Sequence, residues 1–159
     1  MPKGNFGSAI VACGVALALP LLSVGAETAL AQGVNNCDRN QESFGFEIPD
    51  YPIEHQVQAL LNIHVDYRFI TTRPLQKADY INYVPVAEEI DKYLKRYPNE
   101  TDFWEILNKN LVDFVLDKYP SIGSLRIRVE VRPNVAAKYA RHSTVLKTRS
   151  NNCPLINEE

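Results

Sequence analysis

The chain has 159 residues, of which 45% are hydrophobic and 23% are charged, and its formal net charge is −2. This composition is typical of a globular protein with room for one domain. A surface that binds nucleic acid through its phosphates usually carries a strong basic excess, so the charge balance argues against a nucleic-acid partner.

Residues 1–31 differ in composition from the rest of the chain. Lys3 precedes an apolar run from Ala9 to Val24, and Ala29-Leu30-Ala31 has the A-x-A form of a cleavage site. A charged start, an apolar middle and a small-residue end are typical of a secretory signal peptide. The alternative is an uncleaved membrane anchor, but the run is shorter than the ~20 residues of a spanning helix. We therefore expect residues 32–159 to be exported, to the periplasm, a thylakoid-lumen-like compartment or the extracellular space, without a membrane partner.

Cleavage would remove Cys13 and leave Cys37 and Cys153 near the two ends of the mature chain. Two cysteines in an exported protein form a disulfide more often than a metal site, and neither lies in a C-x-x-C motif. The sequence therefore predicts a Cys37–Cys153 disulfide, with two unpaired thiols as the alternative.

Residues 32–52 are expected to form an N-terminal tail and a short first strand. The strand covers residues 43–48, and the two prolines of Pro49-Asp50-Tyr51-Pro52 predict a turn after it. The clearest strand follows from Gln56 to Ile70, where apolar and polar residues alternate with period two. One of its faces is apolar, and the other carries Gln58, Asn62, His64 and Asp66.

Two amphipathic helices come next. Pro85 suits the first turn of a helix over residues 85–97, and Pro98 ends it. The second helix starts near Thr101 or Asp102, and its expected buried stripe consists of Phe103, Ile106, Leu107, Leu111, Phe114, Val115 and Tyr119.

Two strands close the chain. Residues 125–132 alternate between aliphatic side chains and Arg126, Arg128, Glu130 and Arg132, and residues 141–149 form the last strand. Two helices can cover only one face of a four-stranded sheet. We therefore predict an α+β fold of two layers over residues 53–150, with a C-terminal tail at residues 151–159. The polar face of the sheet meets water or lines a wet space in an assembly.

Four stretches resemble the dihydroneopterin aldolase branch of the tunnelling-fold family: ADYINYVPVAEEI, FWEILNKNLVDFVLDKYP, LRIRVEVRP and NVAAKYARHSTV. The resemblance covers roughly residues 53–149. It implies an antiparallel sheet in ββααββ order and a ring of subunits with the polar face inward. It also implies that a pterin- or purine-like ring binds at subunit interfaces, without a cofactor.

The resemblance implies roles for three residues. Glu105 matches the family's anchoring glutamate, whose carboxylate accepts hydrogen bonds from an amino group and a ring N–H. Its alternative is an exposed acid favoured by the helix dipole. Tyr83 matches an active-site tyrosine, or else it packs in the core or an interface. Arg132 stands where the family has a catalytic lysine, and an arginine does not readily exchange protons, which argues against aldolase turnover.

The histidines His55, His64 and His142 lack the H-x-H pair of the zinc-dependent members of the superfamily, so no metal site is expected. The family's sheet order puts the first and last strands at opposite edges, which leaves a disulfide between neighbouring subunits as one arrangement. The alternative functions are a non-catalytic structural oligomer and a protein-interaction module of the same fold.

Overall fold

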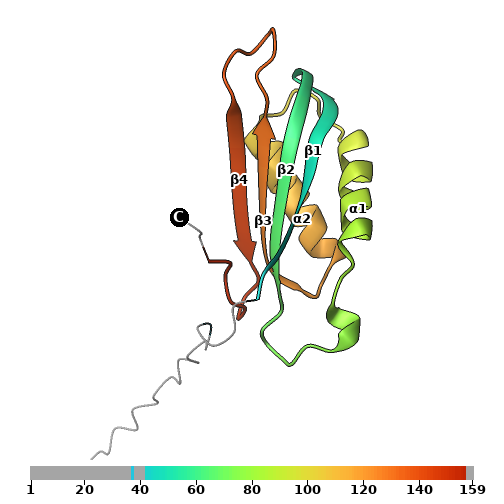
Figure 1. Ribbon diagram of the computed structural model, residues 1–159, viewed down its shortest axis with the longest axis vertical. Helices are drawn as coiled ribbons and strands as arrows, with labels where there is room; N and C mark the ends of the chain where they lie inside the picture. Colours follow the sequence, from blue (N-terminus) through green and yellow to red (C-terminus); the bar gives the residue numbers. More distant parts are fainter. Residues whose placement is uncertain (1–36, 38–41, 157–159) are drawn as a thin grey trace, which may run out of the picture. The chain divides into compact units, whose positions relative to one another are not determined.

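The computed structural model describes residue 37 and residues 42–156, and the predicted signal peptide lies outside them. Its elements are β1 (Phe44–His55), β2 (Val57–Phe69), the 3-10 helix η1 (Lys77–Asp79), α1 (Tyr83–Lys95), α2 (Trp104–Lys118), β3 (Ile122–Val131) and β4 (Arg141–Thr148). The strands form one antiparallel sheet in the order β1-β2-β3-β4. Both helices lie on one face of this sheet (Figure 1), so the predicted two-layer ββααββ arrangement is confirmed.

The core lies between the sheet and the helices. Alternation along β2 and β3 puts their aliphatic side chains on the helix side, where Leu61, Ile63, Ile127 and Val129 are 0% exposed. Burying one such side chain is worth about 1.5–3 kcal/mol. A shift of the strand register by one residue would expose these aliphatic side chains to solvent, so the alternation fixes the register of the strands.

Strand β1 is longer than the sequence predicts, because the expected turn at residues 49–52 is a bulge within the strand. The register shifts between Ile48 and Tyr51, and Asp50 has a φ of 51°. The Asp50 N–H donates to the Asn62 side-chain oxygen at 3.1 Å, which holds the bulge on β2. The two prolines are tolerated because β1 is an edge strand, where one side of the backbone needs no donor.

Helix α2 buries Leu107, Leu111 and Val115 of the predicted stripe, but its buried face is shifted toward residues outside that stripe. Phe103 and Ile106 are 69% and 42% exposed, whereas Trp104 and Asn108 are buried. The Asn108 amide donates to the main-chain oxygens of Ile127 and Ser143, each at 3.0 Å. A buried amide with these bonds ties α2 to both β3 and β4, which explains a polar residue in the core.

The hairpin between β1 and β2 docks on the loop between the helices. His55 is 2% exposed, and its Nε2 donates to the Asp102 main-chain oxygen at 2.8 Å. The ring packs edge-on against Trp104, with 4.6 Å between ring centroids. Burial lowers the pKa of His55 from its usual 6.5, which the hydrogen bond to Asp102 partly opposes.

Cys37 and Cys153 form a disulfide within one chain. Strands β1 and β4 do lie at opposite edges of the sheet, as expected. The C-terminal segment, however, turns back after β4 and lies at the lower end of the sheet, where β1 begins (Figure 1). This return path makes the bond within one chain, and the arrangement between subunits is not the one observed.

No helix in the part of the chain that the structure describes is long and apolar enough to cross a membrane.

Candidate functional site

Glu105 lies in the first turn of α2 with its side chain exposed. Among the described residues it has no ion-pair or hydrogen-bond partner. The N-cap residue Phe103 supplies no side-chain hydrogen bond to the start of the helix. An unpartnered carboxylate beside unpaired amides can hold a ligand that offers adjacent donors. The same position also fits the alternative of an acid favoured by the helix dipole.

Tyr83 is the first residue of α1 and is 46% exposed. Its ring centroid lies 6.0 Å from that of Phe44 and 5.7 Å from that of Phe46, at the start of β1. Helix α2 begins beside His55, at the other end of β1. Tyr83 and Glu105 therefore lie at opposite ends of the helix layer, and a site that uses both must draw them from two copies.

Arg132 follows β3 and faces the polar side of the sheet. Its main-chain N–H donates to the Leu60 oxygen at 3.0 Å, and its guanidinium forms an ion pair with Asp50. It borders a depression of about 290 Å³ together with Pro133 and His142. A guanidinium held by a carboxylate remains charged, so it suits the binding of an anion or a ligand oxygen better than proton exchange.

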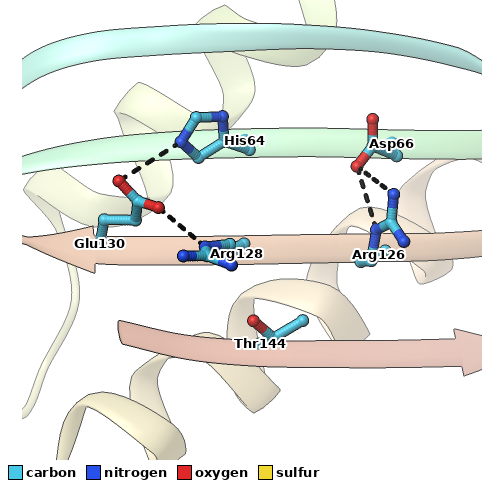
Figure 2. A pocket seen from close by; sticks show the side chains of 6 residues that line it. All are labelled: His64, Asp66, Arg126, Arg128, Glu130 and Thr144. Carbon is cyan, nitrogen blue, oxygen red and sulfur yellow. Dashed lines mark hydrogen bonds and ion pairs between the residues drawn. The ribbon is translucent and has the colours of Figure 1, made fainter. Parts of the chain in front are cut away.

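The polar face of the sheet carries a network of paired charges around a depression of about 360 Å³. Figure 2 shows the side chains that line it, from β2, β3 and β4. The Arg126 guanidinium lies 3.0 Å from the Asp66 carboxylate, and Arg128 donates to Glu130 at 2.8 Å. His64 Nε2 lies 3.7 Å from the Glu130 carboxylate and 3.9 Å from that of Glu47, beyond hydrogen-bond distance.

The pairing explains how this face is stable without a ligand. The register sets Asp66 opposite Arg126, and opposite charges across a strand pair stabilise a sheet. A ligand with a net charge would have to displace a carboxylate from its arginine. The network therefore fits a solvated surface better than a tight binding site for an ion.

Sequence reasoning placed the polar residues of β2 and β3 on one face, and their register confirms this. It did not place Glu47 or Asp50 on this face, because the predicted strand ended at residue 48 and Asp50 fell in the predicted turn, and it missed Thr144. Alternation of His142, Thr144 and Leu146 against the inward Val145 was the available signal. In residue 37 and residues 42–156, no group of three or more His, Cys, Asp or Glu could hold a metal ion.

An antiparallel β1-β2-β3-β4 sheet with two helices on one face and charged residues on the other is the tunnelling fold, and the chain has this fold. It is similar to a provisionally assigned dihydroneopterin aldolase from Vibrio cholerae, with a TM-score of 0.51 and 13% identity, over 69% of this chain and 99% of that one. A dihydroneopterin aldolase from Burkholderia thailandensis, solved bound to guanine, gives a TM-score of 0.44 and 10% identity, over 68% of this chain and 93% of that one. No family model matches the chain, and no curated protein matches its sequence. The likeness to the Vibrio cholerae structure confirms the fold that the resemblance implied.

Proposed function

We propose that the mature chain is exported, assembles as a ring of copies and binds a pterin- or purine-like heterocycle at the interface between two copies. The predicted signal peptide and the Cys37–Cys153 disulfide support export, since structural disulfides persist in oxidising compartments. The fold supports the ring, because two uncovered sheet edges and a polar face without helices are features that barrel closure would cover.

The observation that carries the binding proposal is the free carboxylate of Glu105 at the start of α2. Other exposed acids among the described residues, such as Glu88 and Asp117, also have no ion-pair partner, so the absence of a partner alone does not mark a site. Glu105 differs from them in its place in the first turn of a helix whose N-cap residue supplies no side-chain hydrogen bond. A heterocycle with an amino group beside a ring N–H would satisfy both oxygens of such a carboxylate.

Aldolase turnover is not part of the proposal. Cleavage of this kind needs a group that moves a proton, and the family's lysine is replaced by Arg132, which Asp50 holds as a charged pair. Tyr83 and Arg132 then serve to hold the ligand, the first from the neighbouring copy.

A structural oligomer or a protein-interaction module of the same fold is the second candidate. The paired charges on the polar face favour it, because they need no ligand to be stable. Pterins fluoresce, so a chromophore that co-purifies with the mature protein would favour binding over scaffolding.

The direct test is titration of the mature protein with neopterin and with guanine. A charge-assisted hydrogen bond is worth about 1.5–3 kcal/mol, so Glu105→Gln should weaken binding about tenfold or more. Asp117→Asn is the matched control, because Asp117 is an exposed acid at the other end of the same helix. It should leave affinity unchanged. Equal affinity for wild type and Glu105→Gln would return Glu105 to the role of a surface acid.

A further inference from the structure

Residues 150–156, here called the C-terminal strap, lie against the polar face of the sheet. The Leu155 N–H donates to the Ser124 hydroxyl at 3.1 Å, and Arg68 donates to the Pro154 oxygen at 2.7 Å. At the end of β2, the Cys153 N–H donates to the Thr71 hydroxyl at 3.1 Å. The strap thus contacts the ends of both central strands.

Beside the strap, the β2 and β3 residues of one row of the polar face are buried. Arg68 and Ser124 are paired across β2 and β3, and they are 4% and 0% exposed. The next row of the same face is the ion pair of Asp66 and Arg126, which borders the depression of Figure 2. The polar face is therefore closed at the strap and open at the other end, beside Arg132.

The fit between strap and sheet is close. A side chain at Gly123 would place its Cβ 2.8 Å from the Asn152 side-chain oxygen and 2.9 Å from the Phe69 main-chain oxygen. The same Asn152 oxygen accepts the Thr71 N–H at 2.9 Å. Position 123 is thus occupied by the one residue that lets the strap approach the backbone.

The strap is held by these hydrogen bonds and by three buried residues, Asn152, Cys153 and Leu155, which are 9%, 6% and 5% exposed. Leu155 is its one large apolar side chain that is buried, and Ile156 is 50% exposed. Terminal segments open readily unless they are tied down. The tie here is the disulfide from Cys153 to Cys37, which keeps the strap at high effective concentration over the sheet.

We propose that the strap is a redox-controlled cover of the polar face, closed while the Cys37–Cys153 disulfide is intact and released when a dithiol reduces it. One thiolate of the dithiol displaces a cysteine sulfur, and the second thiol resolves the mixed disulfide. Both cysteines end as thiols, and the dithiol ends as the disulfide. Cys37 is the more exposed of the two cysteines, so the thiolate of the dithiol attacks the Cys37 sulfur. The cover does not depend on heterocycle binding; in the proposed ring it would narrow one mouth of the tunnel.

Amide hydrogen exchange on the mature protein tests the proposal. Among the described residues, the N–H groups of Thr71, Cys153 and Leu155 donate across the contact between strap and sheet. All three should exchange slowly in the oxidised protein and about tenfold or more faster after reduction with dithiothreitol. Exchange at Ile127 and Val129, within β3, should change much less. Unchanged protection at the three amides after reduction would show that the strap is a fixed part of the fold and would overturn the proposal.

Chemical modification of Arg68 gives a second readout. Phenylglyoxal, mapped by mass spectrometry, should modify Arg68 slowly in the oxidised protein and several-fold faster in the reduced protein, because the cover has opened. Leu155→Ala should raise the rate in the oxidised protein, whereas Ile156→Ala, at an exposed position, should not. Equal Arg68 rates in oxidised and reduced protein would contradict the cover, whatever the result of the heterocycle titration.

Discussion

The ion pair of Arg132 and Asp50 places a permanent charge where the family resemblance implies a lysine. The pair forms because β1 does not turn away at its prolines but bulges against β2 beside Asn62, which leaves the Asp50 carboxylate within reach of Arg132 after the end of β3. A change confined to β1 thus affects the chemistry available on another strand.

Arg132→Lys tests that chemistry. Lysine can exchange a proton whereas arginine cannot readily do so, and a positioned acid–base group contributes about 10²–10⁴ in rate. We expect negligible aldolase turnover in the wild type, measurable turnover in Arg132→Lys, and similar heterocycle affinity in both. The assay follows cleavage of dihydroneopterin by product fluorescence. Rapid turnover by the wild type would show that Arg132 supports aldolase catalysis and that its presence does not argue against an enzyme.

His55 gives the hairpin contact a pH dependence. Since burial lowers its folded-state pKa below 6.5, the unfolded chain binds the proton more readily than the folded one. The stability that neutral His55 provides is complete above that pH and is lost as the pH falls below it. We expect the thermal midpoint to fall between about pH 7 and about pH 5, and to fall less in His55→Gln, which keeps a donor for Asp102. The same slope in both proteins would assign the effect to another group.

At the scale of elements, the sequence predicted those strands and helices whose burial is one-sided. Strands β2 and β3 and helix α1 have one buried face each, and this leaves a clear period. The first strand was cut short because a bulge with Pro49 and Pro52 has the local composition of a turn. The buried face of α2 was predicted only in part, because Asn108, a polar residue, is paired inside the core, and its partners are main-chain and side-chain groups of neighbouring strands.

The candidate site was predictable only in part. Glu105, Tyr83 and Arg132 were found by resemblance, and the structure shows where each lies but tests none of their roles. The strap was not foreseen, because residues 150–156 are mostly small or polar and show no period. Their position follows from the disulfide and from hydrogen bonds to residues far away in the sequence.

The disulfide joins elements that no strand pairing joins. Its cysteines are separated by 116 positions, and closing a loop of that length in the unfolded chain is worth about 3–5 kcal/mol. We expect reduction to lower the free energy of unfolding by about this amount in urea denaturation of oxidised and reduced protein.

A non-reducing gel tests whether the disulfide lies within one chain, and it should show a monomer band. A dimer band would place the bond between subunits, and labelling of free thiols in the untreated protein would exclude it.

At the scale of the whole molecule, one copy leaves surfaces that a second copy could cover. Strands β1 and β4 are the edges of the described sheet, and each carries an exposed apolar side chain, Phe44 at 44% on β1 and Leu146 at 41% on β4. Exposed edges invite pairing with another chain, and head-to-tail pairing closes into a ring when the rotation allows it. Light scattering of the mature protein should therefore give a mass several times that of one copy. A strict monomer at micromolar concentration would count heavily against the tunnel.

The proposed heterocycle site lies between copies, with Glu105 from one and Tyr83 from the next. It is tested most directly by mixing two variants, Glu105→Gln and Tyr83→Ala, each of which alone should bind neopterin or guanine weakly. When the two are unfolded together and refolded as mixed rings, about a quarter of the interfaces combine an intact Glu105 with an intact Tyr83 from the neighbour. Tight binding should return in about that fraction of sites. Mixed rings that bind no better than either variant alone would show that the two residues do not share a site.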